Sequence, residues 1–151
     1  MSDLISIGAE APDFTLKTSD GSDFHLRDAL GTSRPLLIFY PKDFTPGCTR
    51  QLDEMNKNIE ALKAASIQPY GVNPGDADSH AKFEASLGLT YPLLIDENAK
   101  VAAAYGAIKE DGSGIERSVV LVGKDGKVAF AERGAPGWDL ILEALQSVAG
   151  A

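Results

Sequence analysis

Cys48, the only cysteine in the sequence, is the residue best suited to nucleophilic or redox chemistry. It follows an apolar run, residues 36–40, and a loop that contains Pro41, Pro46 and Gly47. An amphipathic helix is predicted to begin here, so Cys48 would lie in its first turn. Free backbone N–H groups and the positive end of the helix dipole favour a thiolate there. A thiolate is the reactive form of cysteine, so this position predicts a nucleophile.

A purely structural role is the competing interpretation of Cys48. Free cysteine is often buried as a small hydrophobe, and this one lies on the apolar stripe of its helix: Cys48, Leu52, Met55, Ile59 and Leu62. Three features favour chemistry. Cys48 lies at a helix start, Gly47 lets another molecule approach the backbone, and the helix follows a buried strand, where open α/β sheets bind ligands. A lone cysteine excludes an intrachain disulfide, a C-x-x-C pair and a cysteine-rich zinc site.

Other polar residues near the predicted helix have simpler interpretations. Thr45 is a plausible N-cap, Pro46 suits the first helical position, and the Thr45 hydroxyl can also donate and accept a hydrogen bond beside Cys48. His25 falls on the outer face of a predicted strand. His80 is predicted at the surface or the boundary of a helix. Two scattered histidines do not indicate a metal centre.

The elements predicted around Cys48 alternate between strand and helix. Residues 14–17 and 23–26 form a hairpin, and the chain ends in a helix from about residue 137. The order predicts an α/β protein, one domain over residues 1–151, with a central mixed sheet and helices on both faces. It resembles a thioredoxin fold with an N-terminal β-hairpin extension. Further strands are predicted at 36–40, 67–72, 93–95, 118–122 and 128–132, and helices at 46–62, 76–87 and 96–105.

Charge and hydropathy exclude two classes of partner. The net charge is −8, and an acidic surface repels the phosphates of nucleic acids. The longest apolar run, residues 35–40, is far shorter than the roughly 20 residues of a membrane span. The first residues lack the basic and apolar regions of a secretory signal. We therefore expect a cytoplasmic protein that binds neither nucleic acid nor membrane.

The segment around Cys48 resembles the active-site signature of peroxiredoxins. Residues 39–49 read FYPKDFTPGCT, in which Pro41, Thr45 and Cys48 fill the pattern P-x-x-x-T-x-x-C. The bacterioferritin comigratory protein (PrxQ) subgroup is the most similar. Three further segments, 8–14, 91–96 and 116–122, resemble parts of the same family. The likeness therefore covers nearly the whole chain.

The resemblance implies a role for each matching residue. Cys48 would attack the peroxide as a thiolate and become a sulfenic acid, while Arg117 would stabilise the thiolate and hydrogen-bond the peroxide. Thr45 would orient the peroxide, and Pro41 would keep water off the sulfur. Backbone N–H groups of Gly47 and Cys48 would stabilise charge on the oxygens. Without the motif, Arg117 would be interpreted as a solvated arginine. No metal or organic cofactor is implied.

One departure from the family concerns the second thiol. Many members of the subgroup carry a resolving cysteine five residues after the first, where this chain has Asp53, and others carry it in the next helix, near Phe83 and Glu84. We therefore expect a peroxidase that reduces hydrogen peroxide and organic hydroperoxides with an external thiol. That thiol would be thioredoxin, glutaredoxin or a small thiol. A monomer or weak homodimer is expected.

Three alternative functions fit the sequence less well. A thioredoxin-like disulfide reductase is disfavoured because Thr45 stands where a first cysteine would, and no proline directly precedes residues 118–122. A catalytically silent interaction module is disfavoured because Pro41, Thr45, Cys48 and Arg117 are all retained. A cysteine hydrolase would need a histidine beside the thiol, and neither histidine has a sequence context that indicates this.

Overall fold

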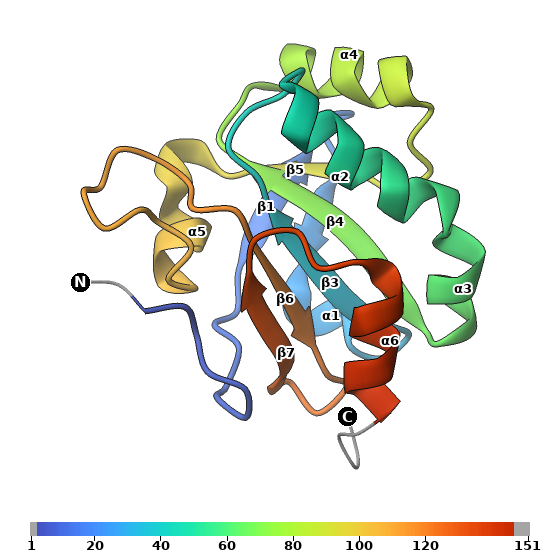
Figure 1. Ribbon diagram of the computed structural model, residues 1–151. Helices are drawn as coiled ribbons and strands as arrows, with labels where there is room; N and C mark the ends of the chain where they lie inside the picture. Colours follow the sequence, from blue (N-terminus) through green and yellow to red (C-terminus); the bar gives the residue numbers. More distant parts are fainter. Residues whose placement is uncertain (1–2, 147–151) are drawn as a thin grey trace.

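A mixed seven-stranded sheet forms the centre of the computed structural model, which describes residues 3–146 (Figure 1). The strand order is β2-β1-β5-β4-β3-β6-β7. Strand β3 is central, parallel to β4 and antiparallel to β6. The strands are β1 (Thr15–Thr18), β2 (Asp23–His25), β3 (Arg34–Phe39), β4 (Ile67–Asn73), β5 (Leu93–Ile95), β6 (Ser118–Val122) and β7 (Val128–Arg133).

Helices cover both faces of this sheet, as predicted. The side chains of β3 alternate between the two faces, so Leu36 and Ile38 join a core with α2, α3, α4 and α6, whereas Leu37 and Phe39 join a core with α1 and α5. The helices are α1 (Leu26–Ala29), α2 (Pro46–Lys57), α3 (Ile59–Ala64), α4 (Ala77–Leu87), the 3₁₀ turn η1 (Glu97–Ala99), α5 (Lys100–Ala104) and α6 (Trp138–Gln146).

The elements differ from the sequence prediction in three places. The helix predicted from Pro46 to about Leu62 is divided at Asn58, whose φ of −111° and ψ of 23° are not helical. Helix α1 follows the hairpin directly and was not predicted. The helix predicted over 96–105 begins as the turn η1, because Asn98 and Ala99 have positive φ. The helix predicted from about residue 137 is described as far as Gln146.

The pairing of β3 with β6 decides where the candidate site lies. Phe39, at the end of β3, is paired with Ser118, at the start of β6. The loop after β3 and the residue before β6 therefore meet at one edge of the sheet. The first turn of α2 lies at this edge as well, because α2 follows that loop.

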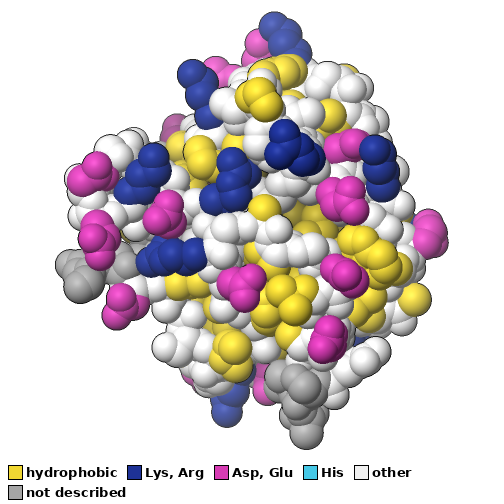
Figure 2. All heavy atoms as spheres, viewed as in Figure 1, with side chains coloured by type: hydrophobic (Ala, Val, Ile, Leu, Met, Phe, Trp, Pro, Cys, Tyr) yellow, Lys and Arg dark blue, Asp and Glu magenta, His cyan; other side chains and the backbone are white. Residues whose placement is uncertain are grey.

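The surface of the molecule is mixed in charge. In the view of Figure 2, acidic and basic side chains both lie on the surface, and hydrophobic side chains are exposed between them. Among the large hydrophobic residues, Ile7, Phe44 and Leu140 are exposed. Within the described residues no helix has the length and the apolar composition that crossing a membrane requires.

Candidate active site

Cys48 is the third residue of α2 and is fully buried, with 0% of its surface exposed. The first hydrogen bond of the helix runs from the N–H of Thr49 to the carbonyl of Thr45, over 2.9 Å. The amides of Gly47 and Cys48 precede this bond, and Pro46 has no N–H to offer. The sulfur therefore lies at the positive end of a helix of ordinary length.

The guanidinium of Arg117 contacts the sulfur directly. Its Nη2 donates to Sγ of Cys48 over 3.3 Å, although the two residues are 69 positions apart in the sequence. Arg117 immediately precedes β6, so the pairing of β6 with β3 brings it to the start of α2. The predicted meeting of Arg117 and Cys48 is confirmed. A cation at this distance would attract negative charge on the sulfur.

Gly47 allows the guanidinium to come this close. A Cβ at Gly47 would lie 3.1 Å from Nη2 of Arg117, a distance shorter than most contacts of a Cβ atom. Any larger side chain would have to displace the guanidinium. The group that lies closest to this glycine is the chain's own Arg117, and the predicted approach of another molecule stays a prediction.

Gln51 is a site residue that the sequence analysis missed. Its Oε1 accepts a hydrogen bond from Nη1 of Arg117 over 2.7 Å, and its buried Nε2 has no hydrogen-bond partner within the described part of the chain. Gln51 lies one helical turn after Cys48 and faces the same way. That spacing was the available signal. A cavity of about 270 Å³ adjoins these residues, lined by Gly47, Gln51 and the segment 135–137 among others.

Thr45 and Pro41 are placed differently from the simplest expectation. Thr45 occupies the N-cap position of α2, but its side chain makes no capping bond. Instead Oγ1 donates to the carbonyl of Lys42 over 2.9 Å, which leaves the lone pairs of the hydroxyl as acceptors. Pro41 is exposed, and its carbonyl accepts a bond from Nδ2 of Asn73. The proposed shielding of the thiolate by Pro41 stays a prediction.

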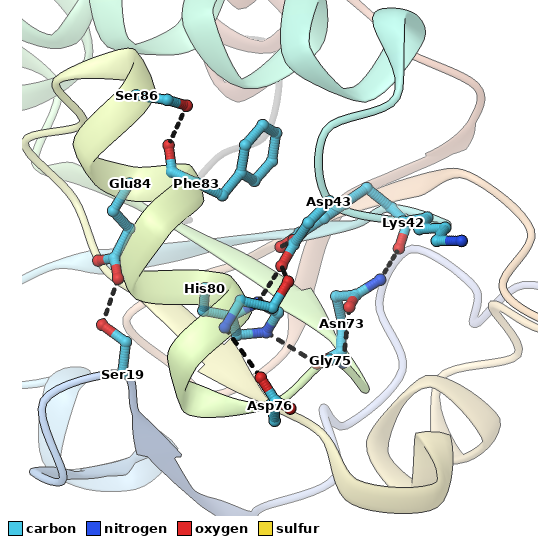
Figure 3. A network of polar contacts seen from close by, with 12 residues as sticks. Ser19, Lys42, Asp43, Asn73, Gly75, Asp76, His80, Phe83, Glu84 and Ser86 are labelled. Atoms are coloured by element: carbon cyan, nitrogen blue, oxygen red, sulfur yellow. Dashed lines mark hydrogen bonds and ion pairs between the residues drawn. The ribbon is translucent and has the colours of Figure 1, made fainter.

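A buried polar network lies beside the loop that leads to Cys48 (Figure 3). Asp43 accepts hydrogen bonds from Tyr40, Ser79 and His80. Burial opposes the charged form of Asp43, but these three bonds together lower its pKa. His80 is fully buried, so its prediction as a surface or boundary residue was wrong. The reason is that the network supplies the partners that a buried histidine requires.

The ion pairs of His25, the other histidine, involve neither Cys48 nor Arg117. It is partly exposed on β2, and its ring nitrogens lie 2.7 Å from Asp13 and 3.2 Å from Asp28. Within the described residues, no group of three or more histidine, cysteine or acidic side chains is arranged to hold a metal ion.

Comparison with known proteins gives one family. The model of the AhpC/TSA family matches residues 7–131. The peroxiredoxin Bcp of Bacillus subtilis is 35% identical over 150 residues, which cover 95% of each chain. The alkyl hydroperoxide reductase E of Mycobacterium tuberculosis is 30% identical over 136 residues, covering 89% of each chain.

Solved structures agree with this match. A mutant of PrxQ from Xylella fastidiosa superposes with a TM-score of 0.86 at 29% identity, covering 96% of this chain and 98% of that one. The bacterioferritin comigratory protein of Xanthomonas campestris, studied for its alkyl peroxide reduction activity, superposes with a TM-score of 0.81 at 30% identity and covers the same shares. The thioredoxin-like fold class predicted from the sequence is thereby confirmed.

Proposed function

Because this chain belongs to the AhpC/TSA family and is a thiol peroxidase with a single cysteine, we propose that Cys48 is the residue that attacks the hydroperoxide. The thiolate forms a bond to the terminal peroxide oxygen, and the O–O bond breaks. The other oxygen leaves and takes up a proton to become water or an alcohol. Cys48 is oxidised to a sulfenic acid, and the peroxide is reduced by two electrons.

The contact of Arg117 with Cys48 is the observation that carries this proposal. A guanidinium 3.3 Å from the sulfur stabilises the thiolate before the reaction. It also presents planar donors to the peroxide oxygens as charge moves from sulfur to oxygen. Gln51 holds the other guanidinium nitrogen and so fixes the direction of these donors.

Thr45, Gly47 and Pro41 complete the proposed site. The Thr45 hydroxyl keeps its lone pairs free for a peroxide O–H, because its own proton is committed to the carbonyl of Lys42. The amides of Gly47 and Cys48 precede the helical hydrogen bonds, which leaves them available to a developing oxyanion. Pro41 is assigned the exclusion of water from the thiolate.

A thiol must then return Cys48 to its reduced form. The chain has no second cysteine, so we propose that the reductant is an external thiol: thioredoxin, glutaredoxin or a small thiol. Hydrogen peroxide and organic hydroperoxides are the proposed substrates, since the related Xanthomonas protein is described as reducing alkyl peroxides. We expect a monomer or weak homodimer. A cytoplasmic location, and one domain over residues 1–151, likewise stay predictions.

Intact-mass analysis after a stoichiometric dose of hydrogen peroxide tests the assignment. The wild-type protein should gain one oxygen, and a reagent specific for sulfenic acids should trap the product. Cys48→Ser serves as the matched control and should gain nothing. A wild-type protein that shows neither the oxygen nor the trapped product would remove Cys48 from the role proposed here.

A further inference from the structure

The loop between β3 and α2 is fastened to α4 through the carboxylate of Asp43 (Figure 3). Oδ1 accepts from the hydroxyl of Tyr40 over 2.6 Å. Oδ2 accepts from the hydroxyl of Ser79 over 2.6 Å and from Nδ1 of His80 over 2.7 Å. The Asp43 side chain is only 4% exposed. Two of its three donors come from α4, so this single carboxylate joins the loop to that helix.

Both ring nitrogens of His80 face acceptor atoms. Its Nδ1 faces the carboxylate of Asp43, and its Nε2 lies 3.2 Å from the carbonyl oxygen of Asn73. A backbone carbonyl and an ionised carboxylate are acceptors only, so this geometry favours a proton on both ring nitrogens, which is the imidazolium form. Asp43 and His80 are therefore a buried ion pair. Removal of one member would leave the other charge buried and unpaired.

The backbone around this pair is closely fitted. Nδ2 of Asn73 donates to the carbonyls of Tyr40 and Pro41, over 2.8 and 3.0 Å, and so fixes the start of the loop to the end of β4. A Cβ at Gly75 would lie 3.1 Å from Cε1 of His80. The segment after β4 therefore passes close to the histidine ring, where a side chain larger than that of glycine would crowd it.

Phe44, the next residue of the loop, adds an apolar contact with the same helix. Its φ of +66° is in the left-handed region, which a bulky residue rarely adopts. Its ring packs on that of Phe83 with the centroids 5.0 Å apart. Residues held in this region persist when their surroundings over-determine them. Here the surroundings are Asp43 on one side and the helix residue Phe83 on the other.

We propose that Asp43 and His80 are positioning residues that hold the thiol of Cys48 against Arg117. The inference rests on the proposed function of Cys48. The loop that they fasten leads without interruption into α2, whose third residue is Cys48. With the pair intact, the sulfur stays buried and in contact with the guanidinium. With the pair broken, the loop and the first turn of α2 can move together. The sulfur then loses its contact with the guanidinium and becomes exposed to solvent.

Two reactions of Cys48 should then change in opposite directions. A peroxide is small and needs the sulfur aligned with Arg117, so its reaction requires the loop to be fastened to α4 by the intact pair. A bulky thiol reagent cannot reach Cys48, which is 0% exposed, so its reaction requires the loop to move away from α4. Cys48 is the only cysteine, which means that any thiol label reports on this residue alone.

The experiment compares the wild-type protein with His80→Gln, which keeps a hydrogen-bond donor but removes the charge. Sulfenic acid formation by hydrogen peroxide is followed in a single turnover by rapid quench and mass spectrometry. Labelling by a maleimide coupled to polyethylene glycol is followed by gel shift. The rate constant for peroxide should fall on the order of tenfold or more, since small misplacements of reacting groups cost this much. The rate constant for labelling should rise.

Two further variants make the result specific. His25→Gln makes the same change in a histidine that also pairs with an aspartate, Asp13, on β2, and should leave both rate constants unchanged. Ser79→Ala removes one of the three bonds to Asp43 without leaving a buried charge. It should shift both rate constants in the directions of His80→Gln, but less. Circular dichroism at the assay temperature checks that each variant is folded, and Ser79→Ala decides the question if His80→Gln does not fold.

Two results would overturn the positioning role. Folded variants at residues 79 and 80 that keep both rate constants within about twofold of the wild type, a small change in mutant kinetics, would show that the pair does not position Cys48. Rate constants that fall together would show an effect on thiolate charge and not on loop position. A wild-type protein that forms no sulfenic acid would instead contradict the proposed function, while the labelling comparison would still report on the loop.

Discussion

At the scale of single residues, the site combines a sulfur at a helix start with one guanidinium. The positive end of α2 and the cation of Arg117 both favour negative charge on Cys48. The second guanidinium nitrogen is held by the neutral amide of Gln51, so this partner leaves the charge of Arg117 intact. A full positive charge therefore faces the atom that is proposed to react.

Replacement of Arg117 by methionine should slow peroxide reduction by a hundredfold or more, the order of magnitude for loss of one charge-stabilising donor. Methionine retains a long side chain but neither the charge nor the donors. The second-order rate constant for hydrogen peroxide provides the measurement, and circular dichroism shows whether the fold survives. A folded Arg117→Met protein with the wild-type rate would make this arginine a surface residue without a part in the reaction.

Thr45 tests the role of a hydroxyl within the same site. Thr45→Val keeps the shape and removes the hydroxyl, so it should slow peroxide reduction strongly and also lose the bond to Lys42. Thr45→Ser keeps the hydroxyl and should be milder. The two rate constants are compared in folded proteins. Equal rates for valine and serine at this position would contradict a role for the hydroxyl.

At the scale of elements, the stability of the contact between α4 and the loop should depend on pH. Burial opposes the charged form of His80, but its hydrogen bond with Asp43 raises its pKa above the usual 6.5. The pKa of Asp43 is lowered below the usual 3.8. The contribution of His80 to the free energy of unfolding is complete below about pH 6.5, and it is lost as the pH rises through the raised pKa. The contribution of Asp43 to the free energy of unfolding is complete above about pH 3.8, and it is lost as the pH falls through the lowered pKa.

The difference in melting temperature between the wild type and His80→Gln should therefore be largest at pH 4–6.5 and shrink at alkaline pH. The measurement is thermal unfolding of both proteins, followed by circular dichroism, at pH values from about 4 into the alkaline range. The pKa of His25 is raised as well, first by its hydrogen bond with Asp13, but His25 is present in both proteins and cancels in the difference. A difference that grows with rising pH would contradict the charged form of His80.

At the scale of the whole molecule, one cysteine decides the fate of the oxidised enzyme. The proposed sulfenic acid of Cys48 can react with an external thiol, form a disulfide between two chains, or be oxidised further to a sulfinic acid. The disulfide between chains is disfavoured, because both sulfurs are buried at helix starts and would have to leave them. Turnover should therefore depend wholly on added thiol.

Excess peroxide without thiol should convert Cys48 to the sulfinic acid, and dithiothreitol should not restore activity. A peroxide titration followed by mass spectrometry, with reducing and non-reducing gels, measures this outcome. A protein that runs mostly as a reducible dimer and regains full activity with thiol would contradict the external route of reduction. The assignment of Cys48 as the attacking residue would survive that result.

Local patterns of the sequence determined much of this protein. The alternation and runs of apolar residues placed the strands, with β6 predicted at its observed bounds, because side-chain periodicity follows from backbone geometry. The resemblance of Pro41, Thr45 and Cys48 to the peroxiredoxin signature indicated the site, and it could be found because these residues are close along the chain. The helix predicted over 76–87 ends at Leu87, and Gly88 follows it with a positive φ of 61°.

Only the tertiary structure decided the contacts between distant segments. The meeting of Arg117 with Cys48 was expected from the family resemblance and not from any local pattern, and it depends on the pairing of β6 with β3. The ion pair of Asp43 with His80 was not expected, and it depends on how α4 packs over the loop. The position of His80 in the apolar pattern of its helix cannot reveal that a carboxylate from another element will be buried against its ring. Such contacts join residues far apart in the chain, and their energy comes from exclusion of water and from charge pairing, which exist only once the elements have packed together.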